Sequence, residues 1–317
     1  MNIVFMGTPN FCIPSLEELY KNCFIQAVVT QTDKKCDRGQ RISETPVKKF
    51  ALKNNIPVLQ PAKIRNNEDF FQSLKKLSPD LIVVIAYGKI LPQQILDIPK
   101  YGCVNIHASL LPYHRGPAPI QYSILTGDSV TGVTSMLMNE KMDEGDILHK
   151  IEYKMAADET AGTLHDKLAE LSARCVVETV EKIKTGNFER IVQDHSKATY
   201  TKYITKELGL ADWSKSSEVL YRVFRATVPW PGFYSYINQN YFKMVDLEPL
   251  VSDVNQPGKI LNVSKDGIEI SCGKGSILIK KIQIPGKKVM EVCDFLNGNN
   301  WFRSGEFVNL NETESVC

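Results

Sequence analysis

The sequence lacks any strong excess of charge of either sign. Its 317 residues carry 38 Lys and Arg against 36 Asp and Glu, a formal net charge of +2. Overall charge therefore does not drive binding to nucleic acid, and any such contact must come from a local basic patch. The sequence also has no run of 18 apolar residues, and its beginning lacks the basic segment of a signal peptide. We therefore expect a cytoplasmic protein with no membrane-spanning helix.

Several motifs of metal and nucleophile chemistry are missing as well. No two of the eight cysteines have the spacing Cys-x-x-Cys, and the five histidines form no His-Glu-x-x-His pattern. No serine lies in a Gly-x-Ser-x-Gly motif. We expect reduced, mostly buried thiols, no metal site and no covalent nucleophile. Gly7-Thr8-Pro9 lacks the further glycines of a phosphate-binding loop, so a tight turn is favoured there over direct ligand contact.

The first half of the chain alternates between short apolar runs and helical patterns. Strands are predicted at 2–7, 25–30, 80–86 and 102–106, and helices at 14–21, 46–54, 66–77 and 92–96. This alternation is typical of an α/β fold with a mostly parallel sheet covered on both faces. From residue 131 the pattern predicts two strands joined by a turn at 143–145, followed by an amphipathic helix over 160–184.

The second half has a different character. A polar connection from about 186 to 207 leads to a predicted helix at 214–225, for which Ser214 is the expected cap. Short strands with turn signals at Pro257-Gly258, Asp266-Gly267 and Pro285-Gly286 follow. Their spacing predicts a small antiparallel barrel or sandwich. We predict three segments: a catalytic domain at 1–188, a linker at 189–205 and a C-terminal domain at 206–314.

Two polar residues end the strand predicted before residue 107. Asn105 and His107 are two positions apart, so their side chains point to the same face of the sheet. The carboxyl edge of an open α/β sheet is where ligands bind. An amide donor beside a titratable imidazole suits the stabilisation of an oxyanion and the transfer of a proton. A hydrogen-bonded strand end explains the pair equally well.

The segment after this pair and a later turn hold further candidates. Leu110 and Leu111, held by Pro112, either pack under the strand end or line a pocket for a flat heteroaromatic ligand. Asp143 lies in the turn between two predicted strands. Aspartate is common in turns because its carboxylate bonds the local backbone, so position alone favours that role.

Two local segments are basic. Residues 33–49 hold six Lys and Arg against three acids, in a long polar loop. Residues 271–290 hold five lysines and no acid. Lysines of this kind either protect an edge strand against aggregation or form a face that contacts phosphates.

The whole pattern resembles a known family. The sequence NIHASLLPYHRGPAPI at 105–120 is similar to the signature of folate-dependent formyltransferases, and the Asp143-Glu144-Gly145 turn follows in the same order. Four further stretches resemble the branch of that family that formylates methionyl-tRNA: MGTPNF near the beginning, VVIAYGKILP at 83–92, ADWS at 211–214 and PWPG at 229–232. The resemblance covers nearly the whole chain.

The resemblance implies a Rossmann-like formyltransferase domain followed by an OB-like β-barrel. It implies transfer of a formyl group from 10-formyltetrahydrofolate to the α-amino group of initiator methionyl-tRNA, without a metal, by a monomer. The implied catalytic residues are Asn105, His107 and Asp143. The implied folate-binding residues are Ala86, Tyr87, Gly88, Ser109, Leu110, Leu111 and Pro112. The implied tRNA-binding residues are Arg38, Arg41, Lys206, Lys280, Lys281 and Lys287.

Two other functions fit parts of the sequence. Related formyltransferases act on amino-sugar nucleotides with the same three catalytic residues, and the basic segment at 33–49 favours tRNA over them. A non-catalytic RNA-binding module on a degenerate formyltransferase scaffold is the other alternative. The intact set of Asn105, His107 and Asp143 argues against it.

Overall fold

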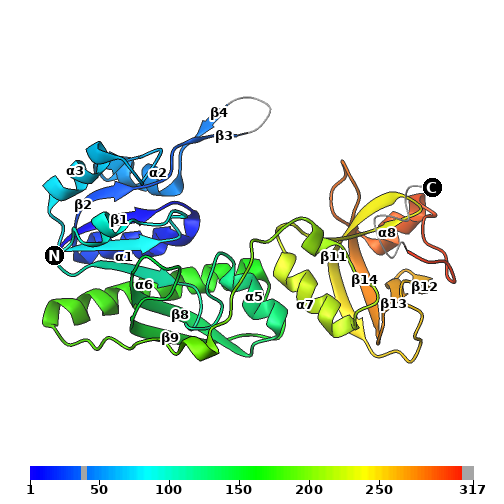
Figure 1. Ribbon diagram of the computed structural model, residues 1–317. Coiled ribbons are helices and arrows are strands. Elements are labelled where there is room, and N and C mark those ends of the chain that lie inside the picture. Colours follow the sequence, from blue (N-terminus) through cyan, green and yellow to red (C-terminus); the bar gives the residue numbers. More distant parts are fainter. Residues whose placement is uncertain (37–40, 309–317) are drawn as a thin grey trace. The chain divides into compact units, whose positions relative to one another are not determined.

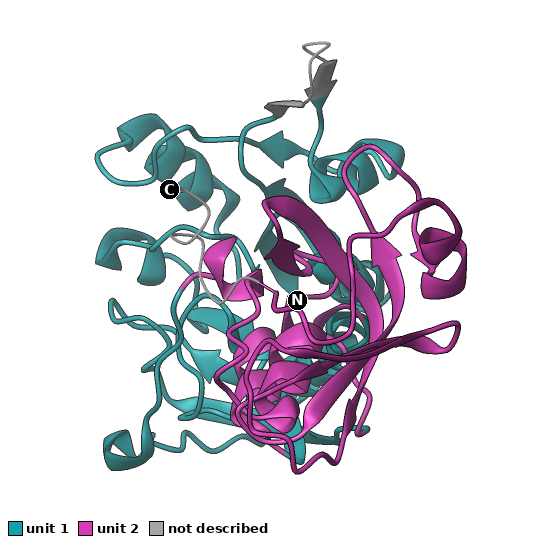
Figure 2. Ribbon diagram, turned by 90° about the vertical axis from the view of Figure 1, so that its right-hand side faces the viewer, with its two compact units in different colours: residues 1–120, 129–156, 163–202 teal, residues 121–128, 157–162, 203–317 magenta. Residues whose placement is uncertain are grey.

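The computed structural model describes residues 1–36 and 41–308, with the backbone alone at 34–36, 41 and 42. These residues form two compact units, coloured separately in Figure 2. The first unit comprises 1–120, 129–156 and 163–202, and the second comprises 121–128, 157–162 and the residues from 203 onward. Most of the segment predicted as a linker, up to residue 202, therefore belongs to the first unit.

A seven-stranded sheet forms the centre of the first unit (Figure 1). Its strands are β1 (Asn2–Gly7), β2 (Phe24–Val29), β5 (Val58–Leu59), β6 (Leu81–Ile85), β7 (Cys103–His107), β8 (Val130–Leu137) and β9 (Ile147–Lys154). In the order β5-β2-β1-β6-β7-β8-β9, the first five strands are parallel and the last two pair antiparallel. The predicted mostly parallel sheet is confirmed.

Helices cover this sheet. They are α1 (Ile13–Asn22), α2 (Pro46–Lys53), α3 (Glu68–Leu77), α4 (Gln93–Leu96) and α6 (Ala161–Thr185). The unit also holds the short 3-10 turns η1 (Asn10–Cys12) and η2 (His195–Lys197), whereas α5 (Pro119–Thr126) belongs mostly to the second unit. The α2 helix begins where the Thr45 side chain accepts a hydrogen bond from the Lys48 amide, directly before Pro46. On β1, Val4 and Met6 pack in one core cluster with residues of α3 and α4. Their neighbours along the strand are buried too, so both faces of the sheet are covered.

The long polar loop predicted after the second strand contains a small ladder. Strands β3 (Lys34–Cys36) and β4 (Arg41–Ser43) pair antiparallel and extend beyond the main sheet of their unit (Figure 1). Arg38 lies outside the described residues, and of Arg41 the structure describes the backbone in β4. The roles predicted for their side chains stay predictions.

A six-stranded antiparallel sheet forms the second unit. Its strands are β10 (Phe233–Ile237), β11 (Asn240–Leu250), β12 (Ile260–Ser264), β13 (Gly267–Ser271), β14 (Ser276–Gln283) and β15 (Met290–Glu291), accompanied by η3 (Glu207–Gly209), α7 (Ser217–Thr227) and α8 (Val292–Gly298). Its core includes Trp213 and Phe295, both fully buried. The predicted small antiparallel β domain is confirmed.

The start of α7 differs from the prediction. Ser216, rather than Ser214, accepts the capping hydrogen bond, from the Val219 amide at 3.3 Å. The hydroxyl of Ser214 instead donates to Asp212, at 2.5 Å. Either serine hydroxyl could accept a capping hydrogen bond. That of Ser214 is already used in the local turn at Asp212.

No helix in the described part of the chain combines the length and apolar character needed to cross a membrane.

Candidate active site

Three predicted catalytic side chains meet at the end of β7. Asn105 and His107 lie on the same face of this strand, and Asp143 comes from the connection between β8 and β9. The Asp143 Oδ1 atom is 3.7 Å from Nδ1 of His107 and 3.5 Å from the Nδ2 atom of Asn105. The fold therefore brings together an amide donor, an imidazole and a carboxylate from two separate parts of the sequence.

The His107 ring is held from its other side. Its Nε2 atom lies 2.9 Å from the backbone carbonyl oxygen of His114, and the side chain is 7% exposed. A carbonyl oxygen can only accept, so Nε2 carries the proton of this hydrogen bond. The neutral ring is then unprotonated at Nδ1, and a second proton enters at Nδ1, facing the Asp143 carboxylate.

The Asp143 carboxylate is fixed by the backbone of the neighbouring loop. Its Oδ2 atom accepts a hydrogen bond from the Gly116 amide at 2.8 Å, which leaves Oδ1 toward Asn105 and His107. Asp143 itself has φ of 55°, a left-handed conformation that non-glycine residues adopt uncommonly. Its position thus depends on contacts outside the residue.

Glycine is required two residues further along the same turn. A Cβ atom at Gly145 would lie 1.7 Å from the carbonyl oxygen of Leu137. This distance is far inside van der Waals contact with backbone, so the turn can pass β8 this closely only with glycine.

The loop after β7 is tied to the neighbouring strands. The Thr134 hydroxyl on β8 donates to the Ser109 carbonyl oxygen at 2.6 Å and accepts from the Leu111 amide at 3.1 Å. The Lys150 ammonium group on β9 donates to the Leu111 carbonyl oxygen. Burial lowers the pKa of Lys150. These contacts fix the backbone of the predicted folate loop.

Four of the predicted folate-binding residues are buried in the protein: Tyr87, Ser109, Leu111 and Pro112. Leu111 is fully buried and packs with Met136 and Ile147. Burying a leucine contributes about 1.5–3 kcal/mol, so moving Leu111 toward a ligand would carry a similar cost. The sequence left two roles open for Leu110 and Leu111. Leu111 packs under the end of the strand, and Leu110 is half-buried.

In the segment after β6, one predicted folate-binding residue is buried and its two neighbours are exposed. The Tyr87 ring is buried in the core, and burial raises the pKa of Tyr87 to about 12. Its backbone oxygen accepts a hydrogen bond from the Gln31 side chain at 2.9 Å. Ala86 and Gly88, on either side, are exposed and have positive φ. They offer backbone and a methyl group to the sheet edge beside β7.

Two of the predicted tRNA-binding lysines are paired with acids. Lys280 lies 2.6 Å from the Glu248 carboxylate and Lys281 lies 3.1 Å from Glu291. Residues 271–290 contain no acid, but the pairing of β14 with β11 and β15 brings the two carboxylates next to these lysines. Lys206 and Lys287 are exposed, and no carboxylate lies within ion-pair distance of either in residues 1–36 and 41–308.

Sequence reasoning missed two buried polar residues beside the Asp143 turn. Arg115 is 1% exposed and donates to the side chain of Gln193. Gln193, which is 3% exposed, in turn donates to the backbone of Asp143. A buried glutamine in a polar connection has no signal in the sequence that separates it from a solvent-exposed one.

The Cys12 thiol, next to the end of β1, is buried and not a nucleophile at neutral pH. The Cys12 thiol donates to the Ile85 carbonyl oxygen at 3.0 Å, and burial raises the pKa of Cys12 to about 12. Such a thiol is protonated at neutral pH. In the described residues, no group of three His, Cys, Asp or Glu side chains has the arrangement of a metal site.

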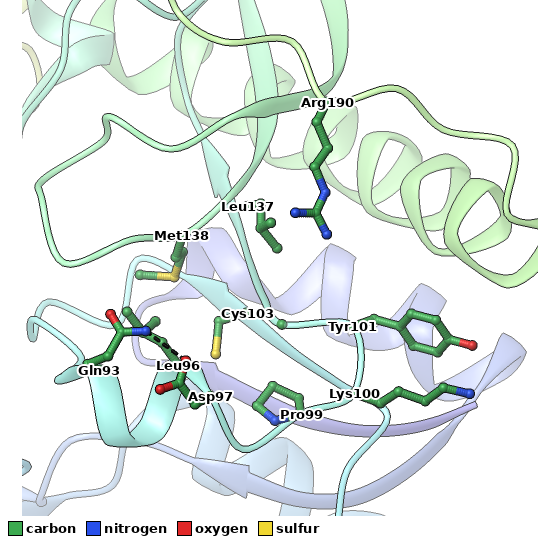
Figure 3. A pocket seen from close by; sticks show the side chains of 11 residues that line it. Gln93, Leu96, Asp97, Pro99, Lys100, Tyr101, Cys103, Leu137, Met138 and Arg190 are labelled. Carbon is green, nitrogen blue, oxygen red and sulfur yellow. Dashed lines mark hydrogen bonds between the residues drawn. The ribbon is translucent and has the colours of Figure 1, made fainter.

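A separate pocket of about 330 Å³ opens at the end of β7 opposite to Asn105 and His107 (Figure 3). It lies beside Cys103, which begins β7, and beside Leu137, which ends the antiparallel β8. Within it the Gln93 amide donates to Asp97 at 2.7 Å. Asn105, His107 and Asp143 do not line this pocket.

Comparison with known proteins gives the class that this fold and site define. The family described as Formyl transferase matches residues 1–180, and the family described as Formyl transferase, C-terminal domain, matches residues 203–300. A methionyl-tRNA formyltransferase of Acetivibrio thermocellus is 46% identical over 94% of this chain and 97% of its own length. One of Clostridium acetobutylicum is 44% identical over 95% of this chain and 97% of its own. The chain belongs to the methionyl-tRNA formyltransferase family and is an enzyme.

Solved structures share the fold at low sequence identity. A sugar 3N-formyl transferase, WlaRD, crystallised in the presence of dTDP and 5-N-formyl-THF, has a TM-score of 0.66 at 19% identity, covering 91% of this chain and 99% of its own. HypX from Aquifex aeolicus in complex with tetrahydrofolic acid has a TM-score of 0.60 at 18% identity. That alignment covers 98% of this chain and 51% of HypX.

Proposed function

We propose that this chain transfers the formyl group of 10-formyltetrahydrofolate to the α-amino group of methionine on initiator tRNA. The observation that carries the proposal is the meeting of Asn105, His107 and Asp143 at the carboxyl end of β7. Whole-chain similarity to methionyl-tRNA formyltransferases supports the choice of acceptor. We further propose that the enzyme is a cytoplasmic monomer.

The three side chains have distinct proposed roles. The amine attacks the formyl carbon, and the carbonyl oxygen becomes an oxyanion in a tetrahedral intermediate. The Asn105 amide and protonated Nδ1 of His107 donate hydrogen bonds to that oxyanion. Asp143 stabilises the imidazolium and accepts the proton that the attacking amine loses. Collapse breaks the bond from carbon to N10, N10 takes up a proton, and tetrahydrofolate leaves.

The proposed folate site lies between the segments that follow β6 and β7. Leu110 forms one wall, with the buried Ser109 and Pro112 behind it, and Ala86 with Gly88 forms the other. Leu111 and Tyr87 support these walls from the protein interior. Apolar walls with a few backbone polar groups suit a flat pterin ring.

The proposed tRNA contacts are electrostatic. Lys206 and Lys287 are the exposed lysines of the predicted set, whereas Lys280 and Lys281 each hold a carboxylate. Arg38 and Arg41 add contacts from the basic segment at 33–49. Each phosphate contact makes tRNA binding more sensitive to salt.

An amino-sugar nucleotide is the alternative acceptor, because WlaRD has the same fold. Its identity of 19% is far below the 46% of the tRNA enzyme from Acetivibrio thermocellus, so tRNA is favoured. The test is to incubate the protein with 10-formyltetrahydrofolate and either methionyl-initiator tRNA or a dTDP-amino sugar. Formylmethionine in the first reaction alone supports the proposal, and formylated sugar alone overturns it. A non-catalytic RNA-binding module would bind the tRNA and give neither product.

A further inference from the structure

The side chain of Gln193 connects the Asp143 turn to Arg115. Its Nε2 atom donates to the carbonyl oxygens of Asp143 at 2.9 Å and Gly145 at 2.7 Å. Its Oε1 atom accepts from Nε of Arg115 at 3.2 Å and from Nη2 at 2.8 Å. Both donors and both acceptor positions of the amide are therefore used, in a side chain that is 3% exposed.

The Arg115 side chain that bonds this amide is itself held in place by several contacts. Its Nη1 atom lies 3.1 Å from the Tyr200 hydroxyl and 3.5 Å from the Glu144 carboxylate, and its Nη2 atom lies 3.1 Å from Nδ1 of His195. A guanidinium group presents its donors in a fixed plane, so contacts in several directions hold it in one position. At 1% exposure, Arg115 is also shielded from competing water.

The backbone around Gln193 is anchored on both sides. Ile191 and Ile147 of β9 exchange two backbone hydrogen bonds, at 2.8 and 2.9 Å. Beyond Gln193, the Arg115 amide donates to the Thr199 carbonyl oxygen at 2.9 Å, and the Thr201 amide donates to the Arg115 carbonyl oxygen at 2.8 Å. The segment from 191 to 201 thus fixes both the Asp143 turn and the loop that supplies Gly116.

We propose that Gln193 is a positioning residue for formyl transfer, which fixes the Asp143 carboxylate against Asn105 and His107. Asp143 needs such support because its left-handed backbone is intrinsically disfavoured. The Gly116 amide holds one carboxylate oxygen, and Gln193 holds the backbone of the turn on both sides of Glu144. This inference rests on the proposed catalytic role of Asp143.

The sharpest variant is Gln193→Glu. The carboxylate keeps the size of the side chain and its acceptors for Arg115, but it replaces the two N–H donors with an oxygen that faces two carbonyl oxygens. We expect the turn to shift and kcat to fall about 10²-fold, the typical effect of a misplaced catalytic group. KM values for folate and acceptor are expected to stay unchanged. The control is Gln94→Glu, at an exposed position of α4, which should keep wild-type kinetics.

A double-mutant cycle separates positioning from general structural damage. If Gln193 acts through Asp143, Gln193→Glu causes no further loss of rate in an Asp143→Ala enzyme. If the two losses multiply fully, or if Gln193→Glu has wild-type kcat, the proposal is overturned. A kcat loss that tracks a loss of folded protein in thermal unfolding also overturns it. Gln193→Met, which keeps the length of the side chain without its amide, repeats the cycle should the Glu variant not fold.

The cycle uses whichever acceptor the wild-type enzyme formylates. Formylation of an amino sugar instead of tRNA would reject the proposed function, while the coupling between Gln193 and Asp143 would still be measured.

Discussion

The Nε2 atom of His107 donates a hydrogen bond to the backbone oxygen of His114, 2.9 Å away. His114 presents this oxygen from a left-handed conformation, with φ of 55°, in the loop that follows β7. The contact orients the ring so that Nδ1 faces Asp143 at 3.7 Å. The loop backbone thereby decides which nitrogen of His107 faces the Asp143 carboxylate.

We predict that neutral His107 is protonated at Nε2 and unprotonated at Nδ1. The reason is that the His114 carbonyl oxygen can only accept a hydrogen bond. Long-range ¹H–¹⁵N correlation spectra of the ¹⁵N-labelled enzyme, compared with His107→Gln for assignment, report the tautomer directly. A ring protonated at Nδ1 would contradict the geometry of the site.

Replacing Gly145 by alanine should damage both stability and activity. The added methyl group would lie 1.7 Å from the Leu137 carbonyl oxygen, so the turn that carries Asp143 has to move. We expect the free energy of unfolding to fall by about 1–3 kcal/mol, with loss of formyl transfer. Denaturant unfolding and the formylation assay measure the two effects. Gly298→Ala is the control and should resemble the wild type, because no described atom beyond the local backbone lies within 4 Å of the new methyl group.

Tyr87→Phe should leave folate binding intact and make the protein less sensitive to high pH. The buried Tyr87 hydroxyl has no hydrogen-bond partner in the described residues, so its loss leaves no group unpaired. The unfolded chain loses the tyrosine proton near pH 10, whereas burial keeps it on the folded protein up to about pH 12. The folded state binds more protons in that window, so wild-type stability falls as pH rises.

Urea unfolding of the wild type and of Tyr87→Phe across pH 10 to 12 measures this contribution of Tyr87 to the free energy of unfolding. The wild-type free energy of unfolding should decline more steeply than that of Tyr87→Phe. Parallel slopes, or a large loss of folate affinity in the variant, would show that the hydroxyl is solvated or contacts the ligand.

The lysines predicted to bind tRNA should differ in their effects. Lys206→Ala and Lys287→Ala each remove an exposed charge, so we expect weaker tRNA binding and a salt slope reduced by about 0.7–0.9 per lost phosphate contact. Lys280→Ala should have a smaller effect, because the ammonium group is paired with Glu248 at 2.6 Å. Filter binding of methionyl-tRNA across a salt series gives both quantities. Equal salt slopes for all three variants would contradict the expected difference between the exposed lysines and the paired Lys280.

The sheet and the pair of Asn105 and His107 could be predicted because both leave local signals in the sequence. Apolar runs such as that at 81–85 mark parallel strands, and the spacing of Asn105 and His107 places them on one face. Asp143 was ambiguous in isolation, since aspartate is common in turns. Only its place in the order of a known signature indicated a catalytic role.

Contacts between distant segments account for most of what was missed. The sequence around residue 193 reads as a polar linker, and nothing local indicates that Gln193 is buried against Arg115 and the Asp143 turn. The acids that pair with Lys280 and Lys281 come from other strands, so the lysine-rich segment seemed more cationic than it is. Leu111 likewise packs inward through contacts with β8 and β9.

The most direct test of the account is single-turnover formyl transfer from 10-formyltetrahydrofolate to methionyl-initiator tRNA by Asn105→Ala. Asn187→Ala, an exposed asparagine beyond α6, serves as the control and should react like the wild type. We predict that Asn105→Ala binds folate normally but reacts about 10²–10³ times more slowly, the usual effect of losing one oxyanion donor. A rate close to that of the wild type would contradict the assignment of this site to catalysis.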